Sequence, residues 1–497
     1  MSSDGPPREI RRDSPRSSAR QPPRPAAESG PGRRPPPRPG RIFHVPGRIE
    51  VLGKHVDYAG GRSLLCATSL GFTFEVRPAD DGLVRLRDRV SDQRATIEVE
   101  MVDGEGSRGP VWSTYPRAVI RRLRDDFDGV ANLGCDIVFS SDLPSAAGLS
   151  SSSAFTTGVL LCLDAVSGVL DSDRARSAIP SLPDLADYVG AIESGRAFGR
   201  LEGRGFEGRR LENGESASDG GEEGGGEREY PGGSDRGVGV RGGSQDHTAI
   251  LCSRPASLLQ ARFGPVDLER YVSHPPDLVF VIGVSGVRAS KAAGARARFN
   301  HLSDLASRIA ELWRTHAGSA EPHLGAILDA APDAGSRLRD ILEREAGSHA
   351  ADMVRRVEQF RLETRELVPG VAEALERGDL TAVGERVDTS QRLAETHLGN
   401  QVPETIHLAR SAREVGAIAA SSFGAGFGGA VWALVEEARA EQFVTAWRAS
   451  YRAAFPRRAS RARFVVTRPS DPAGPLPARF ARARARITDA SPRRPST

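Results

Sequence analysis

The spacing of apolar and polar residues between residues 41 and 468 predicts a chain that contains both strands and helices. Period-two alternation or short apolar runs predict strands at 43–52, 63–76, 84–102, 135–139, 256–271, 278–284 and 430–436. Apolar residues three and four positions apart predict helices at 112–123, 155–170, 185–198, 290–316, 353–365, 385–397 and 406–417. The run from Leu278 to Val284 is apolar without interruption, which predicts a fully buried strand that opens a second half.

Three segments have hardly any large apolar side chains. Residues 1–40 are rich in Pro, Arg and Ser, residues 199–236 in Gly, Glu and Arg, and residues 469–497 in Pro and Arg. Such compositions bury too little apolar surface to offset the entropy of an ordered chain. We therefore expect two disordered tails and a disordered insertion, around an N-terminal domain at 41–272 and a C-terminal domain at 273–468.

Composition limits the partners and the location that we expect. A chain of 497 residues has room for two or three domains, and a net charge of +3 creates no field that favours nucleic acid or a membrane surface. The four cysteines show no metal-binding spacing, which is typical of reduced, buried thiols. No apolar segment is long enough to span a bilayer, and the N-terminus has no hydrophobic region like that of a signal peptide. We expect a cytoplasmic monomer that binds small molecules.

The densest group of chemically capable side chains lies at residues 46–61, which read Pro-Gly-Arg-Ile-Glu-Val-Leu-Gly-Lys-His-Val-Asp-Tyr-Ala-Gly-Gly. The glycines permit tight turns and let a ligand approach the backbone. Between them, the side chains of Arg48, Lys54, His55 and Asp57 offer both hydrogen-bond donors and acceptors, which suits a polyhydroxylated ligand. The alternative is a polar surface hairpin, which would have no need of this mixture.

A loop of small residues follows about a hundred positions later. Residues 143–154 read Leu-Pro-Ser-Ala-Ala-Gly-Leu-Ser-Ser-Ser-Ser-Ala and precede an apolar helix. Small side chains let backbone N–H groups at a helix start face an anion, and serine hydroxyls add donors or metal ligands. A serine-rich helix start without any ligand is the alternative. The candidate anion-binding residues are Ala147, Gly148, Leu149, Ser150, Ser151 and Ser152.

Two further glycine-rich segments carry candidate site residues. Residues 237–252 place Gly243 and Asp246 where a loop enters a helix. Residues 420–430 read Ala-Ser-Ser-Phe-Gly-Ala-Gly-Phe-Gly-Gly-Ala, directly before a predicted strand. Glycines allow such a loop to press closely against a ligand or another loop. The candidate glycines there are Gly424, Gly426 and Gly428.

Together these stretches resemble the motifs of the galactokinase family within the GHMP kinases. The first is similar to Pro-Gly-Arg followed by Gly-Glu-His-x-Asp-Tyr-x-Gly-Gly, the serine loop to Pro-x-x-x-Gly-Leu-Ser-Ser-Ser, and the last to Gly-x-Gly-x-Gly-Gly. The resemblance covers roughly residues 41–468. It departs where Lys54 replaces the family's Glu, Glu50 its Asn and His247 its Gln.

The resemblance implies an α+β fold of two domains, with mixed sheets, helices packed on one side and the active site in the cleft between the domains. It also implies an ATP-dependent kinase that phosphorylates the anomeric C1 hydroxyl of galactose or a related monosaccharide. Because the insertion separates two candidate site residues, Glu193 and Asp246, this interpretation requires the insertion to bulge out of the fold.

The resemblance assigns roles in phosphoryl transfer. Asp246 would accept or orient the proton of the sugar hydroxyl, and Arg48 would keep that carboxylate ionised and stabilise the transferring phosphoryl group. Ser152 and Glu193 would hold Mg²⁺, which binds oxygen ligands from a few protein groups, phosphates and water. Backbone groups of 147–152 would cradle the phosphates of ATP.

The resemblance also assigns roles in binding. Sugar recognition would fall to the side chains of His55 and Asp57 and to the backbone at Gly243. Trp112, in a Trp-x-x-Tyr segment like that of the family, would stack on the adenine of ATP. A plain position in the core is the alternative for Trp112.

Two roles stay open for Lys54. Its ammonium group could contact the far end of the sugar, which would allow a carboxylate at C6, as in galacturonate, or change the pentose or hexose preference, as toward arabinose. It could instead pair with Glu50 or Asp57 without touching the sugar. A non-catalytic galactokinase-like sensor of sugar and ATP is a competing function from another class, and a GHMP kinase of a non-sugar alcohol is a third. Such sensors lose motif residues, whereas Arg48, Asp246 and the serine loop are present, which favours catalysis.

Overall fold

The computed structural model describes the chain in separate stretches. These are residues 40–102, 109–128, 130, 133–144, 147–199, 201, 237–287 and 293–481, with the side chains of 293–296 left out. Three predictions fall wholly or partly outside the described residues. They concern the tail at 1–40, the insertion at 199–236 and the last part of the tail at 469–497.

Within the described stretches, seven strands form a larger, mixed sheet. They are β1 (Arg41–Leu52), β2 (Arg62–Pro78), β3 (Leu83–Asp88), β4 (Arg94–Glu98), β5 (Cys135–Ser141), β6 (Ser257–Arg262) and β7 (Asp267–Ser273). The order is β4-β3-β5-β2-β6-β7, and β1 pairs with β2. The β3 strand runs parallel to β5, and the other described neighbours are antiparallel. The β1–β2 hairpin is the centre of this half, since it carries the first glycine-rich motif at its turn.

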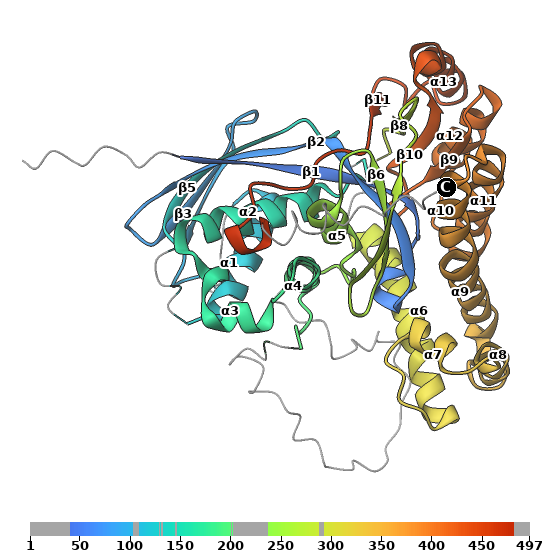
Figure 1. Ribbon diagram of the computed structural model, residues 1–497, viewed down its shortest axis with the longest axis horizontal. Helices are drawn as coiled ribbons and strands as arrows, with labels where there is room; N and C mark the ends of the chain where they lie inside the picture. The colour runs from blue at the N-terminus through green and yellow to red at the C-terminus, as the bar shows by residue number, and fades with distance from the viewer. Residues whose placement is uncertain are drawn as a thin grey trace, which may run out of the picture. The chain divides into compact units, whose positions relative to one another are not determined.

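Helices cover the larger sheet. They are α1 (Thr114–Asp126), α2 (Ser151–Ser167), α3 (Asp173–Ala178), α4 (Leu182–Ser194) and α5 (Gln245–Cys252). Helices α2 and α5 lie directly against β1 and β2, and α1 and α4 pack on α2 (Figure 1). The serine loop and the segment with Asp246 each lead into one of the two helices on the central hairpin. The fold therefore brings the starts of α2 and α5 to β1.

Four described strands form a smaller antiparallel sheet, in the order β11-β8-β10-β9. They are β8 (Leu278–Val284), β9 (Ala419–Ser422), β10 (Ala430–Glu436) and β11 (Arg463–Thr467). The bounds of β8 and β10 coincide with the predicted strands. Val279 and Val281 of β8 face a core cluster with α12 and α13, whereas Phe280 and Ile282 join the core of the larger sheet. Burial on both faces explains why the sequence of β8 has no polar alternation.

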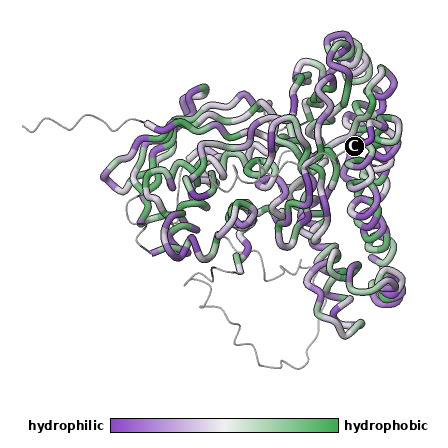
Figure 2. The backbone as a smooth tube through the Cα atoms, viewed as in Figure 1, coloured by the Kyte–Doolittle hydropathy of each residue, from purple (hydrophilic) through white to green (hydrophobic). Residues whose placement is uncertain are grey.

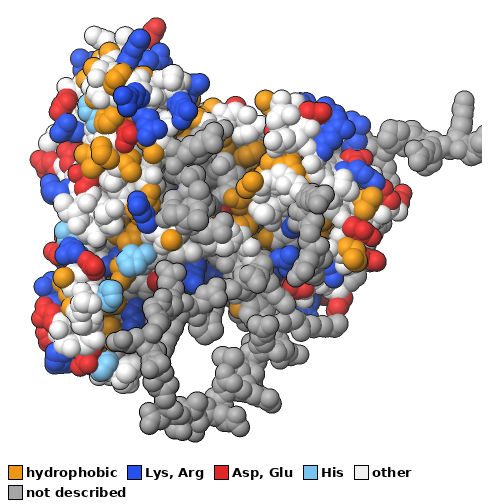
Figure 3. Space-filling view, turned by 180° about the vertical axis from the view of Figure 1, so that it is seen from behind, with side chains coloured by type: hydrophobic (Ala, Val, Ile, Leu, Met, Phe, Trp, Pro, Cys, Tyr) orange, Lys and Arg blue, Asp and Glu red, His pale blue; other side chains and the backbone are white. Residues whose placement is uncertain are grey.

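The remaining helices complete the second half. They are α6 (Ala293–Ala317), α7 (Leu324–Ala330), α8 (Ala334–Glu345), α9 (Ala350–Leu362), α10 (Val368–Glu376), α11 (Leu380–Leu393), α12 (Pro403–Glu414) and α13 (Ala440–Ala454). Hydrophilic and hydrophobic segments alternate along the outer column that contains α9 and α11, as expected for helices with one face in water (Figure 2). Acidic and basic side chains are interspersed on the face seen in Figure 3. Among the described helices, none combines the length and the apolar character that crossing a bilayer requires.

One core cluster spans both sheets. It joins side chains of β1, β2 and α2 to those of β8, β10 and α10. The strands of the larger sheet end at Ser273 and those of the smaller sheet begin at Leu278, which surrounds the expected domain boundary at 272/273. Because the two sheets share apolar contacts, residues on their facing loops can be held in fixed positions relative to one another.

The prediction that the chain is disordered from residue 469 is wrong as far as residue 481. Gly474 exchanges backbone hydrogen bonds with His44 of β1, and the Ala473 N–H donates to the Ile250 carbonyl of α5. Ala473 and Phe480 are buried in the main core cluster. The composition misled us because these few apolar residues add to a core built by distant segments rather than forming one of their own.

We expect Phe480→Ala to lower the free energy of unfolding by about 3 kcal/mol, because it leaves a cavity in the core that the larger sheet shares. Urea unfolding measures the change. The matched control is Val90→Ala at an exposed position, where we expect a change within about 0.5 kcal/mol. Equal, small effects of the two substitutions would show that the segment around Phe480 does not pack as described.

Candidate active site

The turn after β1 is built from residues with left-handed backbone conformations. Gly53 has φ = 106° and His55 has φ = 58°. A Cβ atom on Gly53 would lie 2.2 Å from the Ser63 hydroxyl oxygen, so a larger residue cannot stand there without displacing β2. This turn directs the side chains of His55 and Asp57 into a pocket between the two sheets.

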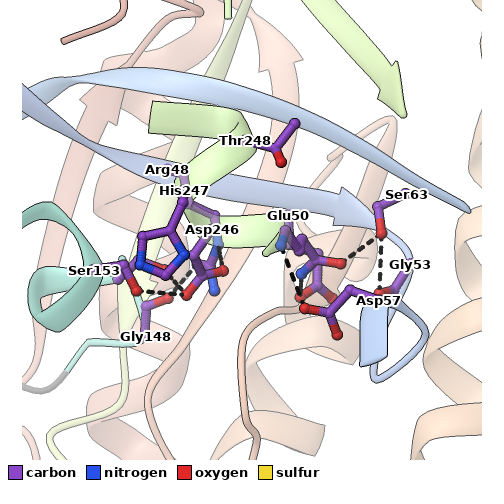
Figure 4. A network of polar contacts seen from close by, with 12 residues as sticks. Arg48, Glu50, Gly53, Asp57, Ser63, Gly148, Ser153, Asp246, His247 and Thr248 are labelled. Atoms are coloured by element: carbon purple, nitrogen blue, oxygen red, sulfur yellow. Dashed lines mark hydrogen bonds and ion pairs between the residues drawn. The ribbon is translucent and has the colours of Figure 1, made fainter. Parts of the chain in front are cut away.

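The structure brings together Arg48 and Asp246, which are 198 positions apart in the sequence. The Arg48 Nε atom donates to Asp246 Oδ1 at 2.7 Å, and its Nη1 atom donates to the Gly148 carbonyl at 2.5 Å (Figure 4). Arg48 is only 3% exposed and comes from the middle of β1. Asp246 lies in the first turn of α5, where the helix dipole favours a negative charge.

The serine loop closes the other side of this ion pair. Ser150, with φ = 57°, donates from its hydroxyl to Asp246 Oδ2 at 2.5 Å. Helix α2 begins at Ser151, four residues earlier than the spacing of apolar residues predicted, because its first turn consists of serines. Gly148 and Ser150–Ser153 line the pocket, whereas the side chains of Ala147 and Leu149 belong to the core. The start of a 17-residue helix thus opens into the pocket.

Oxygen and nitrogen atoms of three side chains gather next to this helix start. The Ser153 hydroxyl donates to Glu193 Oε2 at 2.8 Å, and His247 Nε2 lies 3.0 Å from the same oxygen. Ser152 lines the pocket beside them. The described residues hold no cluster of three His, Cys, Asp or Glu side chains arranged for a metal ion. A cation here would have to complete its shell with hydroxyl, phosphate or water oxygens.

His55 and Asp57 line the pocket, and Asp57 lies on the other side of Asp246 from Ser153 (Figure 4). His55 Nδ1 is 3.0 Å from the Tyr58 hydroxyl, and its Nε2 is 3.1 Å from the Ala425 carbonyl. Burial, together with the charge of Arg356, lowers the pKa of His55 to about 4, so its ring is neutral at pH 7. Burial and the charge of Asp246 raise the pKa of Asp57. The His55 ring therefore presents hydrogen-bonding atoms without a charge.

Two loops approach each other closely at Gly243 and Asp57. A Cβ atom there would lie 2.5 Å from Asp57 Oδ2, so only glycine fits beside that carboxylate. The third glycine-rich loop also meets the serine loop, since a Cβ atom on Gly424 would be 3.1 Å from the Gly148 carbonyl. Gly424, Gly426 and Gly428 all line the pocket, as does Gly243.

Sequence reasoning missed several residues that line the pocket: Glu50, Ser153, Gln245, His247, Phe299 and Phe423. The sequence offered a signal for three of them. Glu50 and His247 stand where the family pattern has Asn and Gln, and Ser153 extends the run of serines. Phe299 lies on α6 outside every motif, 5.2 Å from the His55 ring between centroids. Nothing in its local sequence could have placed it in the pocket.

The expected pairing of Lys54 with Glu50 or Asp57 is wrong, and its side chain lies away from the described lining of the pocket. Lys54 is 1% exposed and is absent from the described lining of the pocket. Its Nζ atom donates to the Ser390 hydroxyl at 2.9 Å, and Ser390 donates to Glu363 Oε1 at 2.9 Å. Among the described residues, no carboxylate oxygen lies within 4.0 Å of Nζ, so Lys54 pairs with neither Glu50 nor Asp57. The reason is the turn, which directs Lys54 toward α11 and its neighbours.

Trp112 also lies outside the described lining of the pocket. Its ring meets Phe139 and Phe155 edge-on, at 5.2 and 5.9 Å between centroids, and its Nε1 atom donates to Gln93 Oε1 at 2.9 Å. These contacts give Trp112 a packing role of its own at the edge of the core. Stacking on adenine stays a prediction.

Comparisons with known proteins find the same family that the motifs resemble. Residues 32–78 match the galactokinase galactose-binding signature, 114–194 the GHMP kinases N terminal domain and 371–453 the GHMP kinases C terminal domain. The chain is 25% identical to a galactokinase of Exiguobacterium sibiricum over 412 residues, covering 81% of this chain and 86% of that one. It is 36% identical to a galactokinase of Bacillus subtilis over 114 residues, covering 23% of this chain and 29% of that one.

A solved structure gives the same result for the fold. The galactokinase of Lactococcus lactis complexed with galactose superposes with a TM-score of 0.65 at 21% identity, covering 88% of this chain and 95% of that one. The α+β fold with two sheets that the motifs implied is therefore confirmed.

We expect the bond between Lys54 and Ser390 to stabilise the fold. Lys54→Met should lower the free energy of unfolding by about 1.5–3 kcal/mol, since it removes a charged donor from a buried hydroxyl. A double-mutant cycle with Ser390→Ala, measured by urea unfolding, should give a coupling energy above about 0.5 kcal/mol. Strictly additive effects would contradict the contact.

Glu50 should make stability depend on pH. Burial raises the pKa of Glu50 from 4.5 to about 7, so between these values the folded state holds a proton that the unfolded chain releases. The free energy of unfolding then falls as pH rises through this window.

Glu50→Gln removes the titrating group, and its amide oxygen can still accept the hydrogen bond that Gln245 donates to Glu50. Between about pH 4 and pH 8, we expect the free energy of unfolding of the variant to rise by on the order of 1–3 kcal/mol relative to that of the unmodified protein, as measured by urea unfolding. Glu436→Gln, at an exposed position, is the control. A difference that stays constant with pH would refute the assignment.

Proposed function

This chain belongs to the galactokinase family of GHMP kinases, and from that premise we propose that it transfers the γ-phosphoryl group of ATP to the C1 hydroxyl of galactose or a closely related neutral monosaccharide. The observation that carries the proposal is the contact between Arg48 and Asp246 beside the start of α2. A carboxylate, a guanidinium and a helix start at one point are what phosphoryl transfer to an alcohol needs.

Asp246 acts on the acceptor hydroxyl in this proposal. Its Oδ1 atom is held by Arg48 and its Oδ2 atom by Ser150, so the carboxylate has one fixed orientation. A sugar hydroxyl that reaches Asp246 can donate its proton toward the carboxylate as the oxygen attacks phosphorus. Arg48 keeps a positive charge beside the reaction, where the equatorial phosphoryl oxygens gain negative charge.

The serine loop holds the phosphates. Backbone N–H groups at the start of α2 and the hydroxyls of Ser151 and Ser152 face the pocket. The oxygen atoms of Ser152 and Glu193 would hold a Mg²⁺ ion in this proposal, because Mg²⁺ takes few protein ligands and retains phosphate and water oxygens. When bound, Mg²⁺ neutralises phosphate charge and fixes the phosphate geometry.

The charges in the pocket favour a neutral sugar. The described lining contains the carboxyl groups of Glu50, Asp57, Glu193 and Asp246 but a single guanidinium, that of Arg48. A uronate would add a carboxylate to a lining that already holds more carboxyl groups than guanidinium groups. Because Lys54 donates to Ser390, its ammonium group gives no support to a preference for galacturonate. His55, Asp57 and the backbone at Gly243 offer donors and acceptors to hydroxyl groups.

ADP release measured with a panel of monosaccharides and uronic acids tests the function. We expect galactose or a neutral relative to stimulate ADP release and galacturonate to give much less. A sensor would bind sugar and ATP, as calorimetry would show, without releasing ADP above the rate of the protein alone. That result would overturn the kinase assignment.

Asp246→Asn should lower turnover by about 10²–10⁴-fold, since it removes the proton acceptor, while ATP binding stays within about threefold. A coupled assay of ADP release measures turnover, and calorimetric titration with ATP measures binding. Asp267→Asn, at an exposed position on β7, is the matched control and should retain full activity. Unchanged turnover in Asp246→Asn would refute the role of this carboxylate.

A further inference from the structure

His247 is a buried imidazole that lines the pocket. It is 2% exposed, and neither of its ring nitrogens hydrogen bonds to any group that the structure describes. Leaving such a polar group unsatisfied in the interior costs free energy, so the position calls for a ligand. In the family pattern the residue after the aspartate is Gln, which makes His247 a feature of this chain.

The position of the ring points to the kind of ligand. His247 Nε2 lies 3.0 Å from Glu193 Oε2, but the pair does not have the geometry of a hydrogen bond. Adjacent ligands of an octahedral cation with bonds of about 2.1 Å are separated by about 3.0 Å. The separation of the two atoms is therefore compatible with two neighbouring ligands of one cation. Figure 4 shows the ring of His247 next to Asp246 and Ser153.

We propose that His247 is a nitrogen ligand of the divalent cation that enters with the nucleotide, and that this protein consequently selects a first-row transition cation such as Mn²⁺ or Co²⁺ over Mg²⁺. The proposal rests on the proposed function, which places a nucleotide and its cation at the start of α2. Glu193 supplies one oxygen, His247 one nitrogen, and serine hydroxyl, phosphate and water oxygens complete the shell.

The selectivity follows from the donor atoms. Mg²⁺ prefers oxygen ligands and gains little from imidazole, whereas Mn²⁺ and Co²⁺ accept oxygen and nitrogen together. Affinity for a mixed site rises along the series from Mn²⁺ to Co²⁺. A kinase with Gln at this position offers only an amide, so it lacks this preference.

Pulsed electron paramagnetic resonance tests the contact directly. One equivalent of Mn²⁺ is bound to the full-length protein with the β,γ-methylene analogue of ATP, which has no nitrogen in its phosphate chain. We expect an electron spin-echo modulation from a directly bound ¹⁴N nucleus, replaced by the ¹⁵N pattern when the protein contains ¹⁵N-histidine. Bound Mn²⁺ without a histidine coupling overturns the proposal.

A substitution provides a second test. His247→Gln, the family residue, should abolish the coupling and weaken Mn²⁺ binding by about 10-fold or more in calorimetric titrations, with a change of less than about threefold for Mg²⁺. His349→Gln, at an exposed position, is the matched control and should retain both the coupling and the affinity. A coupling that persists in His247→Gln, or an equal loss for both metals, overturns the proposal.

The two proposals fail in different ways. The resonance and titration experiments need no sugar and no turnover, so they report on His247 even if no phosphoryl transfer occurs. A histidine coupling without sugar-dependent ADP release supports the metal site while refuting the kinase. Sugar-dependent ADP release without a histidine coupling supports the kinase and refutes the metal site.

Discussion

The buried guanidinium of Arg48 is the constraint on which the rest of the site depends. A charge that is almost wholly removed from water must be paired and hydrogen-bonded. Arg48 meets this demand with Asp246 at the start of α5 and with the Gly148 carbonyl ahead of α2. One side chain from β1 therefore fixes two helix starts, and removing either partner would leave a buried charge uncompensated.

Close contacts between loops also fix parts of the site relative to one another. A Cβ atom on Gly243 would clash with Asp57, and one on Gly424 of the second half would lie tightly against the Gly148 carbonyl of the first. Because one core spans both sheets, these contacts are held by packing and not by the loops alone. Packing thus holds the loops around the pocket in place, which lowers the cost of ordering a substrate.

Three departures from the family pattern have different outcomes in the structure. Glu50 lines the pocket and accepts a hydrogen bond from Gln245, His247 faces Glu193, and Lys54 turns away to Ser390. In the sequence all three are polar substitutions inside or beside a glycine-rich motif. Only the positions of their neighbours distinguish a group that can meet a ligand from one that supports the fold.

The sequence by itself determined the features that depend on local order. Strand β8, strand β10 and the glycine-rich and serine-rich loops follow from residue types at fixed spacing, because backbone conformation and period reflect near neighbours. The motifs in their order were enough to indicate the family and the fold. They were also enough to single out Arg48 and Asp246 as a pair that the fold would have to join.

The tertiary structure decided everything that depends on partners far along the chain. The direction of Lys54 is set by Ser390 and Glu363, more than 300 positions away, and the place of Phe299 in the pocket by the packing of α6. The segment around Phe480 is ordered because a core made elsewhere receives it. A side chain's surroundings are fixed by packing between segments, and the local pattern of a sequence does not contain that information.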